Sequence, residues 1–483
     1  MSAGVRGTIS PEDGRAPKRA PEGIMSDSTI ETQSGQGTPL SRPLWEWLAI
    51  ALLCPLLLAI ALWNGFPIIY YDTGAYVLEG LGHVFLPERS SVYSLFLEVS
   101  GAQISLWLVA VIQAAMTSFV LVQTIRLYLP RATLWTALAM TAALCAATGI
   151  CWYVGQIEPD CFTAIAILSV WLLAFGQSLG PWRRGLLVAI LALATAVHPS
   201  HLGLVAGLII CIALFRLSPW CGRAPANVLR PLLAWLLAVG VILACNFALT
   251  GGVFLSRSGP VFVFARLMQD GIVKKLLDDT CPQSGYRLCI YKGQLPHRAD
   301  AGLWGPHAPF RSKLHGFDGT RREDERIVLD SMRRYPLMQV EAAVKDSVIQ
   351  FFTFRTGDQI EPQEWVLLAG FDRLLPGQKK AYLAARQQRG LIRFRVINMI
   401  NKTVGMVSLI GLFFVMQRMA QRQRWRELSL PVVVLLALVG NAIVCATFAN
   451  PHDRYQSRII WLPTLVLLLA RSRDRRALST EDR

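Results

Sequence analysis

Residues 66–94 read FPIIYYDTGAYVLEGLGHVFLPERSSVYS and directly follow a long apolar run. The stretch gathers charged groups and tyrosines in a chain that carries little charge near its hydrophobic segments. These side chains are Asp72, Glu79, His83, Glu88, Arg89, Tyr70, Tyr71, Tyr76 and Tyr93. We interpret the stretch as a polar loop after a first membrane helix, and as the part of the chain where chemistry would begin.

The composition is typical of an integral membrane protein. Hydrophobic residues make up 53% of the 483 residues, and charged residues only 17%, whereas soluble domains carry about 25% charged residues. The formal net charge of +16 fits either a nucleic-acid partner or the excess of Lys and Arg that membrane proteins keep on their cytoplasmic side. The positions of the basic residues decide between these two interpretations.

Apolar runs of about 17–25 residues predict membrane-spanning helices, and shorter runs can span inside a bundle. We expect an all-α polytopic membrane protein with about ten transmembrane helices, of which the fifth and sixth are short and are separated by HPSH. The expected spans are Leu44–Trp63, Ile104–Ile125, Ala132–Val154, Cys161–Leu179, Leu186–Val197, Leu202–Leu217, Leu229–Thr250, Val396–Met416, Leu430–Phe448 and Ile459–Ala470.

Basic residues alternate between the short loops in a way that predicts the orientation. If the N-terminus is cytoplasmic, the opposite short loops hold almost no Lys or Arg, with Arg89 in the first and Arg454 in the last. The cytoplasmic side then holds Arg126, Arg131, Arg183, Arg184, Arg216, Arg223, Arg230, Arg418, Arg422, Arg424, Arg426 and the five arginines between Arg471 and Arg483. This asymmetry predicts a multi-pass protein of the cell inner membrane with both termini cytoplasmic. It explains the positive charge without nucleic acid, which we exclude as a partner.

The spans divide the chain into five parts. We expect a disordered cytoplasmic tail at 1–42 with Met25 as an alternative start, a seven-helix bundle at 43–250 with its first loop at 64–103, a periplasmic segment at 251–395, three helices at 396–471, and a cytoplasmic tail at 472–483. Within the periplasmic segment, amphipathic periodicity predicts helices at Val261–Leu277, Glu323–Phe354 and Pro376–Arg393.

Four cysteines fall on the expected outer side. Cys281 and Cys289 lie close together in CPQSGYRLC, and an oxidising compartment favours a disulfide between them. Cys151 and Cys161 flank another outer loop and form a second, weaker pair. The rival interpretation is a zinc site, but these four residues lack the usual CxxC spacing.

Polar groups gather in the expected outer loops and leave the spans nearly free of ionisable groups, with Lys402 as the main exception. Ion-coupled transporters instead place such groups at mid-membrane. An interfacial site suits a substrate with an apolar tail in the bilayer and a polar, anionic head. The outer groups besides the first loop are Glu158, Asp160, His198, His201, His452, Asp453, Arg454 and Tyr455.

Three of these positions resemble a known family. The chain is similar to GT-C-type membrane glycosyltransferases such as protein O-mannosyltransferases and lipid A aminoarabinose transferases. The similarity covers roughly the first 200 residues, and lies in Asp72 of YYDTGAY and in Asp160 of EPDCFTAIAILSVWLLAF; a weaker likeness is Arg454–Tyr455 near the end. The chain departs from the family's DE or ExD pair in the first loop, because Thr73 follows Asp72.

The resemblance implies transfer of a sugar, with inversion, from a polyprenyl-phosphate donor to a glycan, lipid or protein acceptor of the cell envelope. Asp72 would be the general base, and Asp160 or Glu158 would orient the acceptor or hold a divalent metal ion. Arg454, with Arg89 or Lys402, would neutralise the departing phosphate. The remaining expected substrate-binding residues are Glu88, His198, His201 and Tyr455.

Each position also has a structural interpretation that the sequence leaves open. Asp72 and Asp160 also fit turn or helix N-cap positions, and Glu88–Arg89 fits a surface ion pair. His198 and His201 suit either a metal site or a loop. Arg454 and Lys402 could be interfacial anchors.

The alternative class of function is a non-catalytic membrane protein, either a transporter of lipid-linked glycans or a component of envelope assembly. A transporter needs a polar path through the spans, whereas a scaffold does not need Asp72 and Asp160 to meet. No GxxxxGK[ST] motif for an ATP-driven pump occurs.

Overall fold

The computed structural model describes residues 42–218, 222, 224–363 and 370–481, so that nearly all of the expected 1–42 tail, Met25 included, lies outside the described residues. The expectation of an all-helical chain is confirmed: the described ranges contain helices and turns but no strand. One isolated bridge joins Ile68 to Gln156. This bridge holds the start of the first loop against the segment that precedes Asp160.

Six helices of the described ranges are long and apolar enough to cross a membrane. They are Leu44–Asn64, which combines α1 (Arg42–Leu57) and α2 (Ala59–Asn64), then α5 (Leu106–Tyr128), α10 (Pro199–Leu217), α11 (Leu229–Thr250), α21 (Phe394–Gln421) and α22 (Trp425–Phe448). The other four expected spans coincide with helices that are shorter or more polar: α6 (Leu134–Ala147), α8 (Cys161–Phe175), α9 (Pro181–Ala196) and α24 (Leu462–Glu481).

Two expected boundaries are wrong. The segment Ala132–Val154 is not one helix, because the chain leaves helical geometry at Thr148 and resumes as α7 (Ile150–Val154). At the C-terminus, α24 continues through the arginine-rich sequence to Glu481 instead of ending near Ala470. Arg and Ala are good helix formers, so a polar sequence can extend an apolar helix beyond its hydrophobic part.

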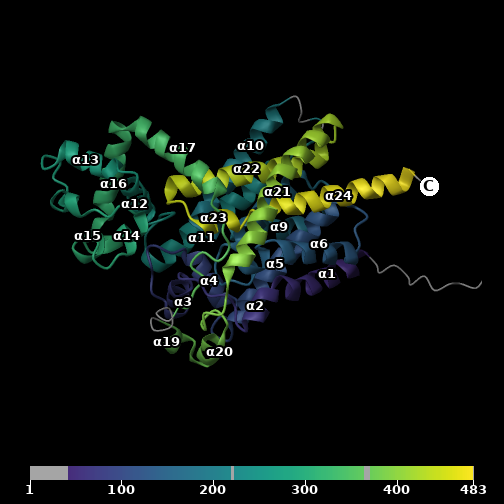
Figure 1. Ribbon diagram of the computed structural model, residues 1–483, viewed down its shortest axis with the longest axis horizontal. Helices are drawn as coiled ribbons and strands as arrows, with labels where there is room; N and C mark the ends of the chain where they lie inside the picture. Colours follow the sequence, from purple (N-terminus) through teal and green to yellow (C-terminus); the bar gives the residue numbers. More distant parts are fainter. Residues whose placement is uncertain (1–41, 219–221, 223, 364–369, 482–483) are drawn as a thin grey trace, which may run out of the picture. The chain divides into compact units, whose positions relative to one another are not determined.

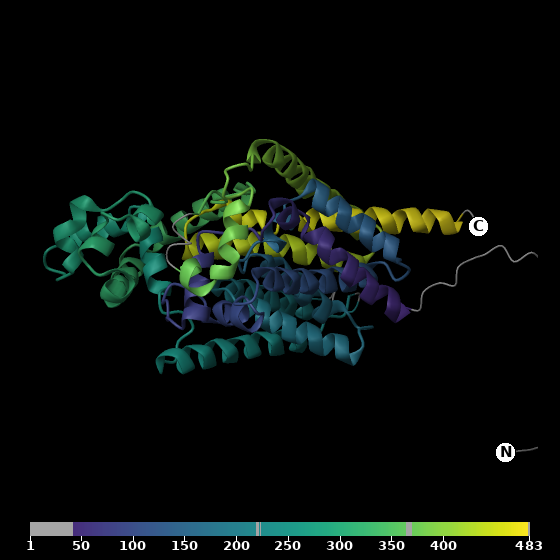
Figure 2. The same cartoon turned by 90° about the horizontal axis from the view of Figure 1, so that it is seen from below.

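The core lies around α8, whose side chains are buried from Cys161 to Ala174. Helices α5, α9, α10 and α22 all pack against it. A helix that is apolar on every side is expected inside a bundle, and α8 has this pattern. Figure 1 labels α5, α9, α10 and α22 in the helical bundle, and Figure 2 shows the same bundle from below.

The first loop is a pair of short helices, α3 (Thr73–Gly82) and α4 (Ser91–Val99), that pack closely together. The buried Glu79 of α3 accepts hydrogen bonds from the hydroxyl groups of Ser91 (2.8 Å) and Ser94 (2.7 Å). Gly80 lies against the carbonyl oxygen of Ser94, and no side chain would fit between them. These contacts fix α3, and with it the position of Asp72 directly before its first residue.

Segment 251–395 contains its own small apolar clusters. Its elements include α12 (Gly259–Gln269), α13 (Ile272–Thr280), η2 (Arg287–Gln294), α14 (Ala299–Trp304), α15 (Pro309–Ser312), α16 (Gly316–Arg334), α17 (Pro336–Phe352), α19 (Asp372–Leu374), η4 (Pro376–Gln378) and α20 (Lys379–Ala384). Figure 1 shows α12 to α16 as one group. Helix α17 extends from this group and packs against α22.

All three helices expected in this segment are interrupted. Val261–Leu277 breaks at Gly271, whose positive φ of 77° suits glycine. Glu323–Phe354 breaks between α16 and α17 at Pro336, since proline cannot donate the required hydrogen bond. Pro376–Arg393 forms only η4, α20 and turns.

The cysteines also separate into two groups. Cys281 and Cys289 form a disulfide bond, with their Cα atoms 5.7 Å apart. Cys151 and Cys161, in contrast, are both free thiols. The structure therefore closes a short loop beside α13 and does not contain the second pair that the sequence suggested.

Candidate functional site

Asp72 lies between two guanidinium groups from distant parts of the chain. Its Oδ1 accepts a hydrogen bond of 2.7 Å from Nη2 of Arg89, and its Oδ2 lies 3.5 Å from Nη1 of Arg454. All three side chains are largely buried. Arg89 belongs to the connection between α3 and α4, and Arg454 to α23 (Asp453–Ser457). The site thus joins the first loop to the last one.

Aromatic rings surround these guanidinium groups. The guanidinium of Arg454 lies 4.6 Å from the ring centre of Tyr70 and 5.3 Å from that of Tyr455. The guanidinium of Arg89 lies 5.5 Å from the ring of Trp304. Such cation–π contacts favour the charged form in a desolvated setting. Trp304 is part of α14, so segment 251–395 contributes directly to the surroundings of Asp72.

Glu158 provides a second carboxyl group beside Asp72. Its side chain is buried, and its Oε1 lies 3.5 Å from the hydroxyl of Thr73, the residue after Asp72. Burial, and then the negative charge of Asp72, raise the pKa of Glu158 well above its usual range, although Arg454 acts in the opposite direction. Glu158 therefore retains a proton at pH values where exposed glutamates have lost theirs, and it can donate a hydrogen bond.

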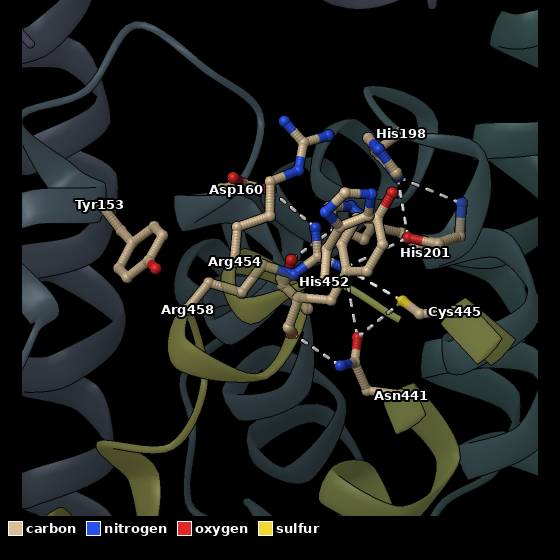
Figure 3. A network of polar contacts seen from close by, with 12 residues as sticks. Tyr153, Asp160, His198, His201, Asn441, Cys445, His452, Arg454 and Arg458 are labelled. Atoms are coloured by element: carbon tan, nitrogen blue, oxygen red, sulfur yellow. Dashed lines mark hydrogen bonds and ion pairs between the residues drawn. The ribbon is translucent and has the colours of Figure 1, made fainter. Parts of the chain in front are cut away.

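Asp160 forms a buried ion pair with Arg458 (Figure 3). Nη1 of Arg458 donates to Oδ1 of Asp160 at 2.7 Å, and both side chains have an exposed fraction of at most 1%. Nη2 of Arg458 also contacts Oδ1 of Asn441 at 3.2 Å. Oδ2 of Asp160 and Nε of Arg458 are buried without a hydrogen-bond partner among the described residues.

One short helix positions both arginines. Arg454 lies in α23 and Arg458 directly follows it, so the two residues are four positions apart. Residues at this spacing lie on the same side of a helix. As a result, α23 directs one guanidinium to Asp72 and the next to Asp160. Asp72 and Asp160 have Glu158 as a common neighbour, since the negative charge of each raises the pKa of Glu158.

Neither aspartate caps its helix with its side chain. Asp72 and Asp160 occupy the N-cap positions of α3 and α8, but neither carboxylate makes a capping hydrogen bond. The expected N-cap positions are therefore confirmed, but neither side chain makes the hydrogen bond that stabilises a helix start. Their carboxylates contact arginines instead.

The two histidines of HPSH have structural contacts. Nδ1 of His198 accepts a hydrogen bond from the backbone N–H of Ser200 and thereby caps α10. The buried His201 is held by the hydroxyl of Thr163 at 2.7 Å and by the carbonyl oxygen of Ala194 at 2.6 Å. The structure thus gives this pair structural roles, with His198 at the start of α10 and His201 inside it, packed against neighbouring elements.

The structure places the other expected residues as follows. Arg89 pairs with Asp72 and not with Glu88, so the expected surface pair is wrong. Tyr455 stacks beside Arg454 and Arg458. Lys402 is half-buried on α21, where its charge acts on Asp453.

His452 links segment 251–395 to the loop that carries Arg454. Its Nε2 lies 3.4 Å from Oδ1 of Asp300, and its Nδ1 lies 3.7 Å from Oδ2 of Asp358. The same Asp358 oxygen accepts a hydrogen bond from the backbone N–H of Arg454. Burial alone would lower the pKa of His452, but the two carboxylates raise it to about 9.

Sequence reasoning missed Arg458, Asp358 and Trp304. Arg458 had a signal, because it is a second basic residue on the side that the distribution of Lys and Arg leaves nearly free of them. Asp358 and Trp304 had none, since their partners lie about 100 or more positions away in the sequence. Only the folded chain brings them to the site.

The arrangement combines a carboxyl group between two arginines, a second buried carboxyl group, and guanidinium groups that suit phosphate oxygens. The described part of the chain contains no group of three or more His, Cys, Asp or Glu residues that could hold a metal ion. Comparisons with protein-family models, curated proteins and solved structures found no match for this chain.

We predict that replacing Arg458 by Met destabilises the protein strongly. The change leaves the charge of Asp160 buried and unpaired, which costs about 3–5 kcal/mol in comparable cases. Thermal unfolding of the purified protein measures the effect. The double variant R458M/D160L removes both charges and should recover much of the loss; a double variant as unstable as R458M would contradict the ion-pair account.

We also predict that the contact between His452 and Asp300 depends on pH. The folded pKa of about 9 exceeds the value of about 6.5 for an unfolded histidine. The stabilisation is therefore complete below pH 6.5 and is lost as pH rises through 9. Hydrogen exchange in α14, corrected for intrinsic rates, should become faster across this range.

The matched variant for this experiment is His452→Gln. It should show fast corrected exchange in α14 at every pH, because an amide cannot take up the proton. If the wild-type protein and His452→Gln respond to pH in the same way, His452 does not hold α14.

Proposed function

We propose that this chain is a GT-C-like membrane glycosyltransferase that moves a sugar from a polyprenyl-phosphate donor to a cell-envelope acceptor. Asp72 is the proposed general base. The resemblance at Asp72, Asp160 and Arg454–Tyr455 supports this function, and so does the meeting of these residues in one polar cluster.

The proposal includes a position in the membrane. It places ten helices across the cell inner membrane, with both termini in the cytoplasm and segment 251–395 in the periplasm. The distribution of Lys and Arg supports this orientation. The four shorter helices fit because spans inside a bundle can be short where neighbouring helices cover them, as α8 is covered.

One observation carries the catalytic proposal: Asp72 is held between Arg89 and Arg454, and the buried Nε of Arg89 has no hydrogen-bond partner among the described residues. A buried donor without a partner costs free energy. A phosphate oxygen of the substrate would satisfy it. Arginine suits this role because its guanidinium can donate two parallel hydrogen bonds to a phosphate.

The proposed reaction is a single displacement. Asp72 takes the proton from the acceptor hydroxyl while the oxygen of that hydroxyl forms a bond to the anomeric carbon of the sugar. The bond between that carbon and the phosphate oxygen breaks, and its electron pair stays on the lipid phosphate. Attack from the opposite face inverts the anomeric centre. Arg89 and Arg454 stabilise the charge that develops on the phosphate.

The surrounding groups have supporting roles in this proposal. Glu158, which keeps its proton because it is buried, donates a hydrogen bond to a substrate oxygen. Tyr70 and Trp304 offer aromatic rings next to the two arginines, where a sugar can pack. Asp160 acts through Arg458 as a positioning residue, because its Oδ1 accepts the hydrogen bond of the buried ion pair.

We predict that Asp72→Asn lowers sugar transfer by a factor of about 10²–10⁴, the usual contribution of a general base. Asparagine keeps the size of the side chain but cannot accept the proton. The measurement is transfer of radiolabelled sugar from polyprenyl-phosphate donors in membranes that contain the full chain.

The matched control is Asp318→Asn, which removes an exposed carboxylate of segment 251–395 and should leave transfer unchanged. Thermal unfolding of Asp72→Asn would detect a loss of folding. A folded Asp72→Asn protein with normal transfer would remove Asp72 as the base. A wild-type protein that transfers no sugar from any donor tested would favour the non-catalytic class.

A further inference from the structure

Helix α17 presents an apolar stripe that the other described residues leave uncovered. The stripe repeats every three or four residues, as on one face of a helix. Its members are exposed to between 54% and 83%, and they are Leu337, Val340, Val344, Val348 and Phe352. Exposure of such a stripe to water is unfavourable, because burying each large apolar side chain would stabilise the protein by about 1.5–3 kcal/mol.

Part of this stripe forms one wall of an apolar groove of about 550 Å³. The other wall is α22, one of the six helices long enough to cross a membrane. The groove is lined by Val340, Ala343, Val344, Ser347, Val348, Phe351, Phe352, Val439, Ile443 and Thr447. Since the apolar surface of α22 continues into the groove, the hydrocarbon of a bilayer has direct access to it.

The opposite side of α17 lines a polar cavity of about 760 Å³. Helix α17 contributes Glu341, Lys345 and Asp346 to this cavity, and the end of α12 contributes Asp270. The groove and the cavity meet at the ends of two helices. Phe352 and Thr447 line the groove, whereas the neighbouring Thr353 and Asn450 line the cavity.

Two carboxyl groups that line the cavity lie near the same buried cation. Nε of the buried Arg266 lies 2.8 Å from Asp270 and 3.9 Å from Asp346. The side chain of Asp346 is more than nine-tenths buried, and its Oδ2 has no hydrogen-bond partner among the described residues. Burial raises the pKa of Asp270 to about 6, helped by the charge of Asp346 and a hydrogen bond to its side chain and opposed by Arg266 and Lys345.

Basic groups line the same cavity. Lys345 and Arg298 both line it, and the charge of Lys345 acts on Asp270. Lys345 is exposed. The cavity thus offers donors for an anion next to acceptors for a cation. This pattern matches a head group that carries a phosphate and a primary ammonium on neighbouring atoms.

We propose that the groove and the cavity together bind one ethanolamine-type phospholipid. An acyl chain lies between α17 and α22, the phosphate contacts Lys345 and Arg298, and the ammonium contacts Asp346 and Asp270. This inference depends on the position in a membrane but not on sugar transfer. The ammonium would contact Oδ2 of Asp346, which has no hydrogen-bond partner among the described residues.

Lipid retention tests the proposal. The full chain is reconstituted into nanodiscs with equal amounts of phosphatidylethanolamine, phosphatidylglycerol and phosphatidylcholine, and the lipids that remain bound are identified by native mass spectrometry. We expect one phosphatidylethanolamine to be retained at least tenfold more often than either other lipid. Phosphatidylglycerol lacks the cation, and phosphatidylcholine has no N–H to donate. Equal retention of the three lipids would overturn the proposal.

Matched variants separate the groove from the cavity. Val344→Glu places a charge in the groove and should reduce retention at least tenfold, whereas Leu337→Glu changes the same stripe outside the groove and should not. Equal effects of these two variants would remove the groove as the chain-binding site.

For the head group, Asp346→Asn should abolish the preference for ethanolamine, and Lys345→Gln should reduce retention of the preferred lipid. Lys380→Gln on α20 is the control for a lost surface charge. A preference that survives Asp346→Asn would remove Asp346 as the ammonium site. Circular dichroism verifies that each variant is folded.

Discussion

The structure depends on the pairing of buried charges. A buried carboxylate without a counterion is strongly unfavourable, and Asp160 is fully enclosed by the central helices. Arg458 supplies the countercharge from the other end of the chain. The pairing obliges α23 to lie against the start of α8, and the same helix then brings Arg454 to Asp72. The buried ion pair is thus accompanied by a second contact, between Asp72 of the first loop and Arg454 near the end of the sequence.

Long apolar runs made the helices predictable, since Leu229–Thr250 has the predicted bounds in the structure. Breaks were less predictable, because local geometry at Thr148 or Gly271 interrupts a pattern that is otherwise continuous. The charged loops correctly indicated Asp72, Glu158 and Arg454 as neighbours. Arg458 was missed because it directly precedes an apolar run, and the sequence does not show which way its side chain turns. His452 and Asp300 are 152 positions apart, and no sequence pattern relates them.

Segment 251–395 contributes side chains to the surroundings of the candidate site. Trp304 lies over Arg89, and Asp300 holds His452 two residues before Arg454. A displacement of α14 would therefore alter the surroundings of both arginines at once. On the other side of the segment, α17 separates the apolar groove from the polar cavity. In the proposed function, the same segment covers the reacting groups and contacts the membrane lipids.

The central claim is that Arg89 and Arg454 bind a lipid-linked sugar phosphate next to Asp72. The most direct measurement is a cryo-electron microscopy structure of the full chain with a non-transferable polyprenyl-phosphonate sugar. The account predicts that the phosphonate contacts both guanidinium groups and that the anomeric carbon faces Asp72. A phosphonate bound elsewhere, with the pairs of Asp72 intact, would contradict it.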